Sequence, residues 1–314
     1  MEQEYLTPDE VASELKLTRY TVYEMIKRGE LPASKIGRTL RIARSDLGQF
    51  MQRNRSRDEH LPPFAVPTAI SQVEAGDIAF AGSHDLAVDL LARMLSGRGV
   101  TLLPAYCGSL DGLIELYKGR VQIAGCHLLD PLTGEYNLSH IRCLLPYEDV
   151  RVINLVSRWQ GFVVPKGNPR MITSWQELLS GSHRIANRQR GSGTRMLLDY
   201  QLNHAGISPE HIPGYEQELT THYATAAAIL QGQADVALGI ESVANGLGLD
   251  FFPIHEERYD LVIPARYVQQ ERFQTLLDVL HDPSFRQAVV AQGGYSIART
   301  GSVIRLDDAA NARP

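Results

Sequence analysis

Three arginines surround a Gly-Ser-Gly-Thr core in the segment NRQRGSGTR at positions 187–195. Such a segment combines positive charge and hydroxyl groups with glycines, which allow backbone N–H groups to approach a bound group closely. This chemistry suits an anion, either the phosphate of a nucleic acid or a small anion held in a pocket. The choice between these two ligands depends on the elements that position the segment.

Three other polar loops begin at the ends of short apolar segments in the same way: AGSHD at the end of 78–82, YCGSLDG at the end of 100–106 and GCHLLD at the end of 121–128. These apolar segments, together with 184–188 and 234–240, are predicted to be buried parallel strands. Helical patterns alternate with them, including helices over 192–204 and 221–231. This order predicts an α/β architecture.

In parallel sheets, ligands bind outside the carboxyl ends of the strands, where all four loops are expected to lie. Helix N-termini add unpaired N–H groups and partial positive charge. We therefore favour a small-anion pocket. His84 and His127 lie in these loops, and for both of them contact with the ligand and a capping or supporting role remain equally open. The candidate ligand-binding residues are Ser83, His84, Ser109, His127, Arg188, Arg190, Ser192, Gly193 and Thr194.

Two further segments predict two lobes. Residues 150–169 read as two consecutive β stretches that carry the chain from one lobe to the other, and residues 248–264 supply the return. Two crossings between two α/β lobes make a clamshell. Arg195, one step inside the helix that follows the loop, is expected to pair with Asp199 four residues later.

The first sixty residues have a different character. Thr7, Pro8 and Glu10 form the signature of a helix N-terminus with a capping box, and a second helix follows from Thr18 after a tight turn, as in a helix-turn-helix motif. Residues 34–42 predict a hairpin wing. The residues expected to contact DNA lie on the second helix and on the wing: Thr18, Arg19, Tyr20, Thr21, Tyr23, Lys27, Arg28, Arg38 and Arg41.

Charge separates the same two regions. Residues 16–57 carry eleven basic and three acidic side chains, a net charge of +8, whereas the whole chain has −5, so the remainder has −13. A basic module on an acidic body indicates that one end binds nucleic acid. The predicted domains are 1–53 for DNA binding, 54–75 as a proline-containing linker and 76–314 for ligand sensing.

Residues 5–51 resemble the excisionase or MerR-like winged helix-turn-helix, through the Leu-Thr start, RGELPA, the Gly-Arg turn and the later R…DL. Residues 76–285 resemble the type II periplasmic-binding-protein superfamily, through AGSHDLAVDLL, YCGSLDGLIEL, NRQRGSGTR and ADVALGIE. More narrowly, they are similar to the cytoplasmic version associated with MoeA-type molybdenum-cofactor proteins. That resemblance implies molybdate or tungstate as ligand and Arg188 as its contact. The sequence departs from it by placing Arg190 where an acidic residue is common.

These features predict a ligand-responsive, DNA-binding transcriptional regulator that senses a small anion. The alternatives are a sensor of a molybdopterin precursor or an organic acid, or an accessory factor or enzyme of molybdenum-cofactor assembly. Walker, HExxH and GxSxG motifs are missing from the sequence, so we expect no catalysis, no metal site and no cofactor beyond the effector. We also expect a cytoplasmic homodimer, because paired DNA sites require two heads and the sequence lacks a signal segment or membrane span.

Overall fold

The computed structural model describes residues 5–14, 22, 26, 31–36, 39–47, 76–180, 183–304 and 306. The chain forms two compact units, residues 1–63 and 64–314. The predicted domain boundaries, at 53/54 and 75/76, involve residues outside the described ones.

The N-terminal unit is built around a small sheet of order β1-β3-β2, with β1 (Tyr5–Leu6), β2 (Ser34–Ile36) and β3 (Thr39–Ala43). The β2–β3 hairpin matches the predicted wing. Helix α1 (Pro8–Glu14) begins at the predicted capping box, where the backbone N–H of Glu10 donates to Thr7 Oγ1 (3.2 Å) and that of Thr7 donates to the Glu10 carboxylate (2.7 Å). The buried core of this unit includes Val11, Val22, Leu31, Ile42 and Leu47.

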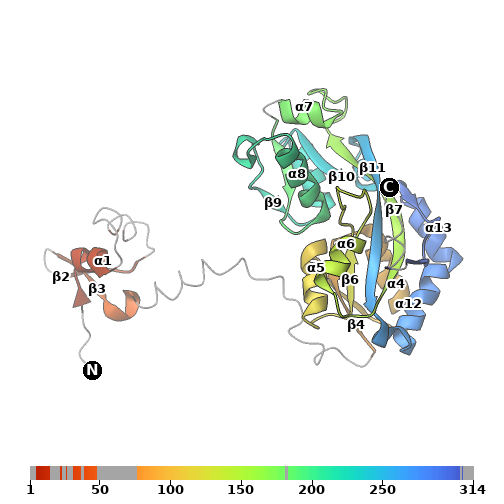
Figure 1. The fold of residues 1–314 in the computed structure, drawn as a ribbon. Helices are drawn as coiled ribbons and strands as arrows, with labels where there is room; N and C mark the ends of the chain where they lie inside the picture. The colour runs from red at the N-terminus through yellow and green to blue at the C-terminus, as the bar shows by residue number, and fades with distance from the viewer. Residues whose placement is uncertain are drawn as a thin grey trace. The chain divides into compact units, whose positions relative to one another are not determined.

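In the second unit, lobe 1 contains three parallel strands in the order β5-β4-β6, of which β4 and β6 are labelled in Figure 1. They are β4 (Ile78–Gly82), β5 (Leu102–Ala105) and β6 (Ile123–Cys126). Each strand leads toward a helix: α4 (Leu86–Ser96), α5 (Ser109–Tyr117) and α6 (Leu138–Leu144). Strands β4 and β6 are buried throughout, which explains their apolar sequences, whereas β5 at the edge of the sheet is buried only at its two ends.

Lobe 2 repeats this plan with parallel strands β10 (Val236–Ile240), β8 (Ile185–Arg188) and β9 (Glu218–Leu219). The helices of this lobe are α7 (Trp175–Ser180), α8 (Gly193–His204), α9 (His222–Leu230) and α10 (Glu241–Gly246), with a short 3-10 turn at Pro209–His211. Ser192 and Thr221 cap α8 and α9 by accepting backbone N–H groups on their side-chain oxygens.

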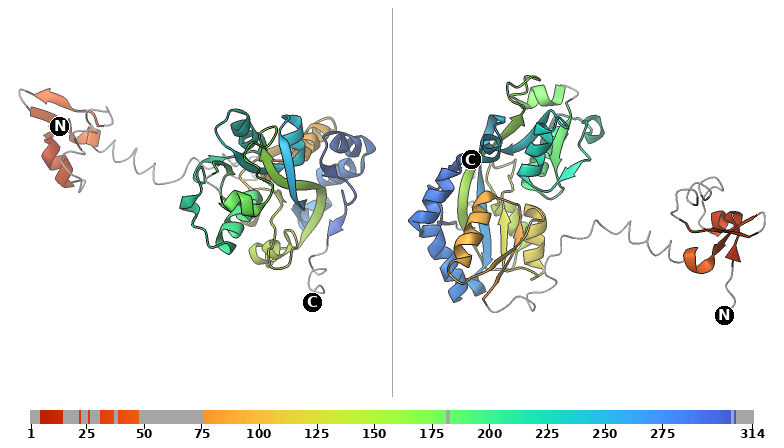
Figure 2. Two further views of the ribbon diagram at one scale, coloured as in Figure 1. Left: turned by 90° about the horizontal axis from the view of Figure 1, so that it is seen from above. Right: turned by 180° about the vertical axis from the view of Figure 1, so that it is seen from behind.

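Two long antiparallel strands, β7 (Val150–Val164) and β11 (Asp250–Pro264), run through both lobes (Figure 2). The predicted return crossing is therefore confirmed. The prediction that 150–169 makes two β stretches was wrong, because β7 is one continuous strand. The register with β11 shifts at two places: Ile254 is the extra residue on β11 between Pro253 and His255, and Leu155 is the extra residue on β7, opposite the step from Tyr259 to Asp260. Such bulges bend a strand without interrupting the neighbouring one.

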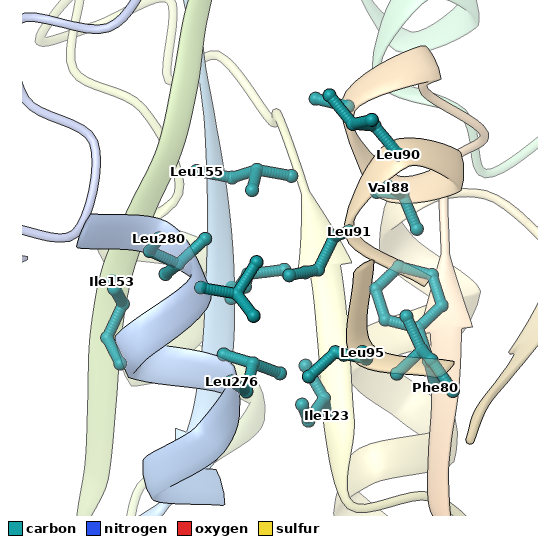
Figure 3. Packing of buried hydrophobic residues seen from close by; sticks show 14 of the residues in the cluster. Phe80, Val88, Leu90, Leu91, Leu95, Ile123, Ile153, Leu155, Leu276 and Leu280 are labelled. Carbon is teal, nitrogen blue, oxygen red and sulfur yellow. The ribbon is translucent and has the colours of Figure 1, made fainter. Parts of the chain in front are cut away.

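The chain then returns to lobe 1 through α11 (Ala265–Val268), α12 (Glu271–His281) and α13 (Pro283–Ala291), and β12 (Tyr295–Ser296) and β13 (Val303–Ile304) pair with β7. Helices α12 and α4 cover one face of the lobe 1 sheet. Figure 3 shows Leu276 and Leu280 of α12 facing Leu91 and Leu95 of α4 across the core. This packing fixes the carboxyl ends of the strands, from which the polar loops project.

Candidate anion-binding site

Arg188 is the last residue of β8 and is completely buried. Its Nε donates to Gln189 Oε1 (3.2 Å) and its Nη2 donates to the carbonyl oxygen of Thr220 (3.1 Å). Nη1 has no hydrogen-bond partner among the described residues, and no described carboxylate lies within 4.0 Å of this guanidinium. A buried cation that is hydrogen-bonded only to neutral groups and keeps an unused N–H donor can bind an anion.

Other buried nitrogens of lobe 2 also lack a hydrogen-bond partner among the described residues. In the described part of the chain, neither ring nitrogen of His222 has a partner, nor does Nε2 of Gln189. His222 is the first residue of α9, directly after the capping Thr221. Its imidazole is close enough to Arg188 for that charge to act on its pKa. Buried polar groups are nearly always satisfied, so a group of unsatisfied ones indicates a bound species.

A buried ion-pair network lies at the middle of the crossing strands. Arg158 of β7 faces Glu257 of β11 in the strand register, and its Nε lies 2.7 Å from Glu257 Oε1. The same guanidinium pairs with Asp85, whose other oxygen caps α4 by accepting the backbone N–H of Ala87 (2.6 Å). Tyr295 of β12 donates to Asp85 as well. Arg158 therefore has two acidic partners, whereas Arg188 has none within the described residues.

His127 connects this network to the loops. Its Nδ1 lies 3.0 Å from Glu257 Oε2, and its backbone N–H donates to Ser109 Oγ (3.1 Å). Its ring stacks on Tyr259 with 5.7 Å between centroids. Its Nε2 is buried without a partner among the described side chains and backbone groups. One edge of the imidazole is thus fixed and the other remains available.

The hydroxyls predicted to donate are mostly used within the protein. Ser83 Oγ and Ser109 Oγ are hydrogen-bonded to each other at 2.9 Å, and Ser192 Oγ donates to the carbonyl oxygen of Gln189 (2.9 Å). Thr194 Oγ1 accepts from Gln160 Nε2 (3.1 Å). All four hydroxyl side chains are buried. Their observed role is to hold the loops in place.

The two lobes touch at these loops. The backbone N–H of Leu110 in lobe 1 donates to the carbonyl oxygen of Gly191 in lobe 2 (2.9 Å). A Cβ at Gly193 would lie 2.3 Å from the carbonyl oxygen of His127, and one at Gly108 would lie 2.9 Å from Gly191. Glycine is needed at 193 and 108 because backbone meets backbone there. The lobes are therefore closed on each other.

Electrostatics sets Arg188 apart. Burial and the positive charge of Arg158 lower the pKa of Arg188 to about 9, with Glu257 and Tyr259 acting in the other direction. Burial raises the pKa of Glu257, but Arg158 and His127 outweigh that effect and bring it to about 2. A carboxylate thus remains ionised beside Arg158, while Arg188 carries a poorly compensated charge. An anion beside Arg188 would supply the missing compensation.

Two predicted ligand residues do not join the buried group. The Arg190 side chain is 71% exposed and pairs with Glu216 and Glu218. Nε2 of His84 is bound to Asp89 Oδ2 (3.0 Å), which favours the supporting role that the sequence left open. Arg195 pairs with Asp199 Oδ1 at 2.9 Å, as predicted. We therefore leave Arg190 out of the candidate site.

Of the predicted DNA contacts, only Arg41 lies among the described residues, half-buried on β3. The other predicted DNA contacts, Thr18, Arg19, Tyr20, Thr21, Tyr23, Lys27, Arg28 and Arg38, lie outside the described residues.

The sequence reasoning missed His222, Gln189, Arg158 and Glu257. His222 follows a capping threonine at the start of a predicted helix, the same signal that selected Ser192 and its neighbours. Arg158 and Glu257 carry no such signal, because they lie inside long strands. The described residues contain no group of three His, Cys, Asp or Glu side chains placed to hold a metal, and none of the described helices has the length and apolar character that a membrane crossing requires.

Two lobes joined by paired crossing strands, with buried polar groups where they meet, define a two-lobed binding protein. The model of the PBP superfamily domain matches residues 92–281, and that of a helix-turn-helix domain matches residues 5–55. The chain belongs to the PBP superfamily and carries an N-terminal helix-turn-helix domain. The predicted fold class is confirmed, and the resemblance is confirmed at this level.

The chain is 35% identical over 305 residues to the uncharacterized protein YvgK of Bacillus subtilis (strain 168), covering 95% of this chain and 97% of that one. The fold is similar to that of the sulfate-binding protein SubI of Mycobacterium tuberculosis H37Rv. The TM-score is 0.52 and the identity 15%, and the match covers 70% of this chain and 86% of SubI. It is equally similar to that of EhuB in complex with hydroxyectoine. The TM-score is 0.52 and the identity 13%, and the match covers 76% of this chain and 96% of EhuB. At these identities the likeness concerns the fold and not the ligand.

Proposed function

We propose that this chain is a ligand-responsive DNA-binding regulator that binds a small oxyanion between the lobes of its PBP domain. One observation carries the proposal: the completely buried Arg188 has no acidic partner among the described residues, and its Nη1 has no hydrogen-bond partner there. Keeping a buried cation without a counter-charge is costly, so such an arrangement indicates that an anion completes it.

The proposed binding residues are Arg188, Gln189 and His222 from lobe 2 and His127 from lobe 1. Their unpartnered atoms are nitrogens, which suits a ligand made largely of acceptor oxygens. Ser83, Ser109, Ser192 and Thr194 hold the loops around them, and Gly193 allows the lobes to meet. A ligand that contacts both lobes would favour the closed arrangement over an open one.

Molybdate or tungstate is the proposed ligand. The support is the family resemblance of the loop NRQRGSGTR, together with a group of buried nitrogens that have no partner among the described residues. The test is calorimetric titration of the full chain against molybdate, tungstate, sulfate, phosphate and small carboxylates. Tight binding of molybdate or tungstate with weak binding of the carboxylates is expected. A carboxylate that binds more tightly than every oxyanion would contradict the proposal.

The DNA-binding half of the proposal rests on the helix-turn-helix domain and on the charge of +8 over residues 16–57. Arg19 and Arg28 are the proposed contacts of the second helix, and Arg41 is the proposed contact of the wing. Replacing Arg19 or Arg28 with Ala is expected to weaken binding to the upstream region of the chain's own gene, measured by gel shift. Each lost phosphate contact should reduce the salt slope of binding by about one unit.

Titration of the same variants with oxyanion separates the two halves of the proposal. Their ligand affinity is expected to equal that of the wild type, since the N-terminal unit contains none of the proposed anion contacts. Unchanged DNA affinity in both variants at moderate salt would remove the second helix as the DNA-contacting element. The proposed oligomer is a homodimer, which sedimentation of the full chain with and without DNA tests.

A further inference from the structure

Counted over the whole buried site, the formal charges sum to zero without any ligand, although both carboxylates pair with Arg158 and no described carboxylate forms an ion pair with Arg188. Arg158 and Arg188 contribute two positive charges, and Asp85 and Glu257 contribute two carboxylates. An oxyanion such as molybdate carries two negative charges. Burying both of them in a neutral cluster would be expensive unless something else became positive at the same time. The histidines are the side chains in the cluster whose charge can change near neutral pH.

The hydrogen bonds of His127 determine which of its nitrogens is available. Glu257 is ionised and can only accept, so Nδ1 of His127 carries the proton in the 3.0 Å bond between them. In the neutral imidazole, Nε2 is then a bare acceptor, buried and without a partner among the described residues. An acceptor directed at an anion is repulsive, whereas a protonated Nε2 would donate to it.

We propose that the anion enters this site together with one proton, which Nε2 of His127 takes up from solvent, so that a fully deprotonated dianion is held against an imidazolium. This inference rests on the proposed function, because it concerns the same site. Glu257 supports the charged ring from the opposite edge, as a carboxylate orients and stabilises an imidazolium elsewhere in protein chemistry.

The surroundings explain why the ring stays neutral until the ligand arrives. Burial lowers the pKa of His127, and the charges of Arg158 and Arg188 lower it further, against the opposing effect of Glu257. A dianion near Arg188 would reverse the sign of the nearby field and favour the imidazolium. The charged and titratable groups around His127 are Glu257, His255 and Tyr259 on β11, Arg158 on β7, Arg188 at the end of β8 and His222 at the start of α9.

His222 has a different role. Burial and the charges of Arg188, Arg158 and His127 all lower its pKa, and no carboxylate of the described chain is bonded to it. It therefore stays neutral and can donate to the anion from one nitrogen. The two histidines provide a matched pair: both contact the ligand, and only His127 changes its charge.

The experiment measures proton uptake by calorimetry. Molybdate is titrated into the full chain at a single pH in two buffers that differ in ionisation enthalpy, and the difference between the observed enthalpies gives the number of protons taken up. About one proton is expected. Repeating the titration across pH should weaken molybdate binding about tenfold for each pH unit above the pKa of the free site.

Three variants assign the proton. His127→Gln should take up no proton and show a flat pH profile, with weaker binding at low pH. His222→Gln should bind more weakly but still take up the proton. His211→Gln is the control, since His211 is exposed and lies in the short 3-10 turn of lobe 2, and it should match the wild type in both respects.

The outcomes separate this inference from the function on which it rests. Molybdate binding without proton uptake by the wild type, or uptake that persists in His127→Gln, overturns the role of His127 and leaves the oxyanion site intact. If molybdate, tungstate, sulfate and phosphate all fail to bind the wild type, the proposed function is wrong and this inference is lost with it. Both wild-type measurements stand even if a variant does not fold.

Discussion

The polar groups that the two lobes contribute to the site differ in how far they are already hydrogen-bonded within the protein. In lobe 1, Ser83 and Ser109 bind each other, His84 binds Asp89, and Asp85 binds Arg158. In lobe 2, Arg188, Gln189 and His222 each keep nitrogens that have no partner among the described residues. The difference indicates that lobe 1 mainly provides a hydrogen-bonded framework, with His127 as its one proposed ligand contact, and that lobe 2 provides the other proposed donors.

This comparison also explains why two buried arginines in one site have different consequences. Arg158 stabilises the framework because it connects Asp85 of lobe 1 to Glu257 of the crossing strands. Arg188 forms no ion pair with a described carboxylate, and its Nη1 has no hydrogen-bond partner among the described residues, so its charge is available to a ligand. Replacing Arg158 should therefore destabilise the fold, and replacing Arg188 should weaken ligand binding.

The largest expected effect belongs to Arg158→Met. The substitution leaves Asp85 and Glu257 buried without their shared cation, and breaking such a pair from one side costs about 3–5 kcal/mol. Urea unfolding followed by tryptophan fluorescence measures this loss, because both tryptophans, Trp159 and Trp175, lie in the second unit.

Arg266→Met is the control for that experiment. Its ion pair with Glu148 is exposed, and surface pairs are worth at most about 1 kcal/mol. Equal unfolding free energies for the two variants would show that the buried network does not support the lobes.

Arg188→Met should have the reverse effect. Loss of a hydrogen bond to a charged ligand group is worth about 1.5–3 kcal/mol, so oxyanion affinity should fall about ten- to a hundredfold. Without ligand, the unfolding free energy should stay the same or rise, because a poorly compensated buried charge is removed. Melting curves with and without oxyanion measure both quantities. Destabilisation similar to that of Arg158→Met would mean that Arg188 belongs to the framework.

Gly193→Ala tests the contact between the lobes. Its Cβ would meet the carbonyl oxygen of His127 at 2.3 Å, so the lobes could not approach as closely as observed. Overpacking of this kind costs about 1–3 kcal/mol, which should appear as weaker oxyanion binding in a titration. Gly246→Ala is the matched control in lobe 2, because a Cβ there has nothing within 4 Å. Wild-type affinity in Gly193→Ala would show that closure at this contact is not needed for binding.

Arg190→Ala should have the smallest effect. Its side chain is 71% exposed and already paired with Glu216 and Glu218, so its removal should change oxyanion affinity by less than about twofold. The same titration measures it beside Arg188→Met. A loss as large as that of Arg188→Met would return Arg190 to the site and reassign the two arginines.

The sequence by itself determined the local elements and the places where polar groups leave them. The capping box of Thr7 and Glu10, the apolar strands and the caps at Ser192 and Thr221 follow from interactions between neighbours in the chain. Arg188 was found in the same way, because a strand end followed by a helix N-terminus is a local pattern. The expectation of a clamshell came from the two crossing segments.

The tertiary structure alone decided which polar groups are satisfied. Arg158 meets Asp85 and Glu257 over separations of 73 and 99 residues, and His127 meets Glu257 over 130. Arg188 and Arg190 are two residues apart, yet Arg188 is buried without an ion pair to a described carboxylate, whereas Arg190 is exposed and pairs with two acids. Sequence patterns give the direction of a side chain from its strand. Whether an acidic side chain lies next to that side chain depends on which distant strand packs beside its own strand. The Coulomb energy between the two charges then depends on their distance in space and on their burial.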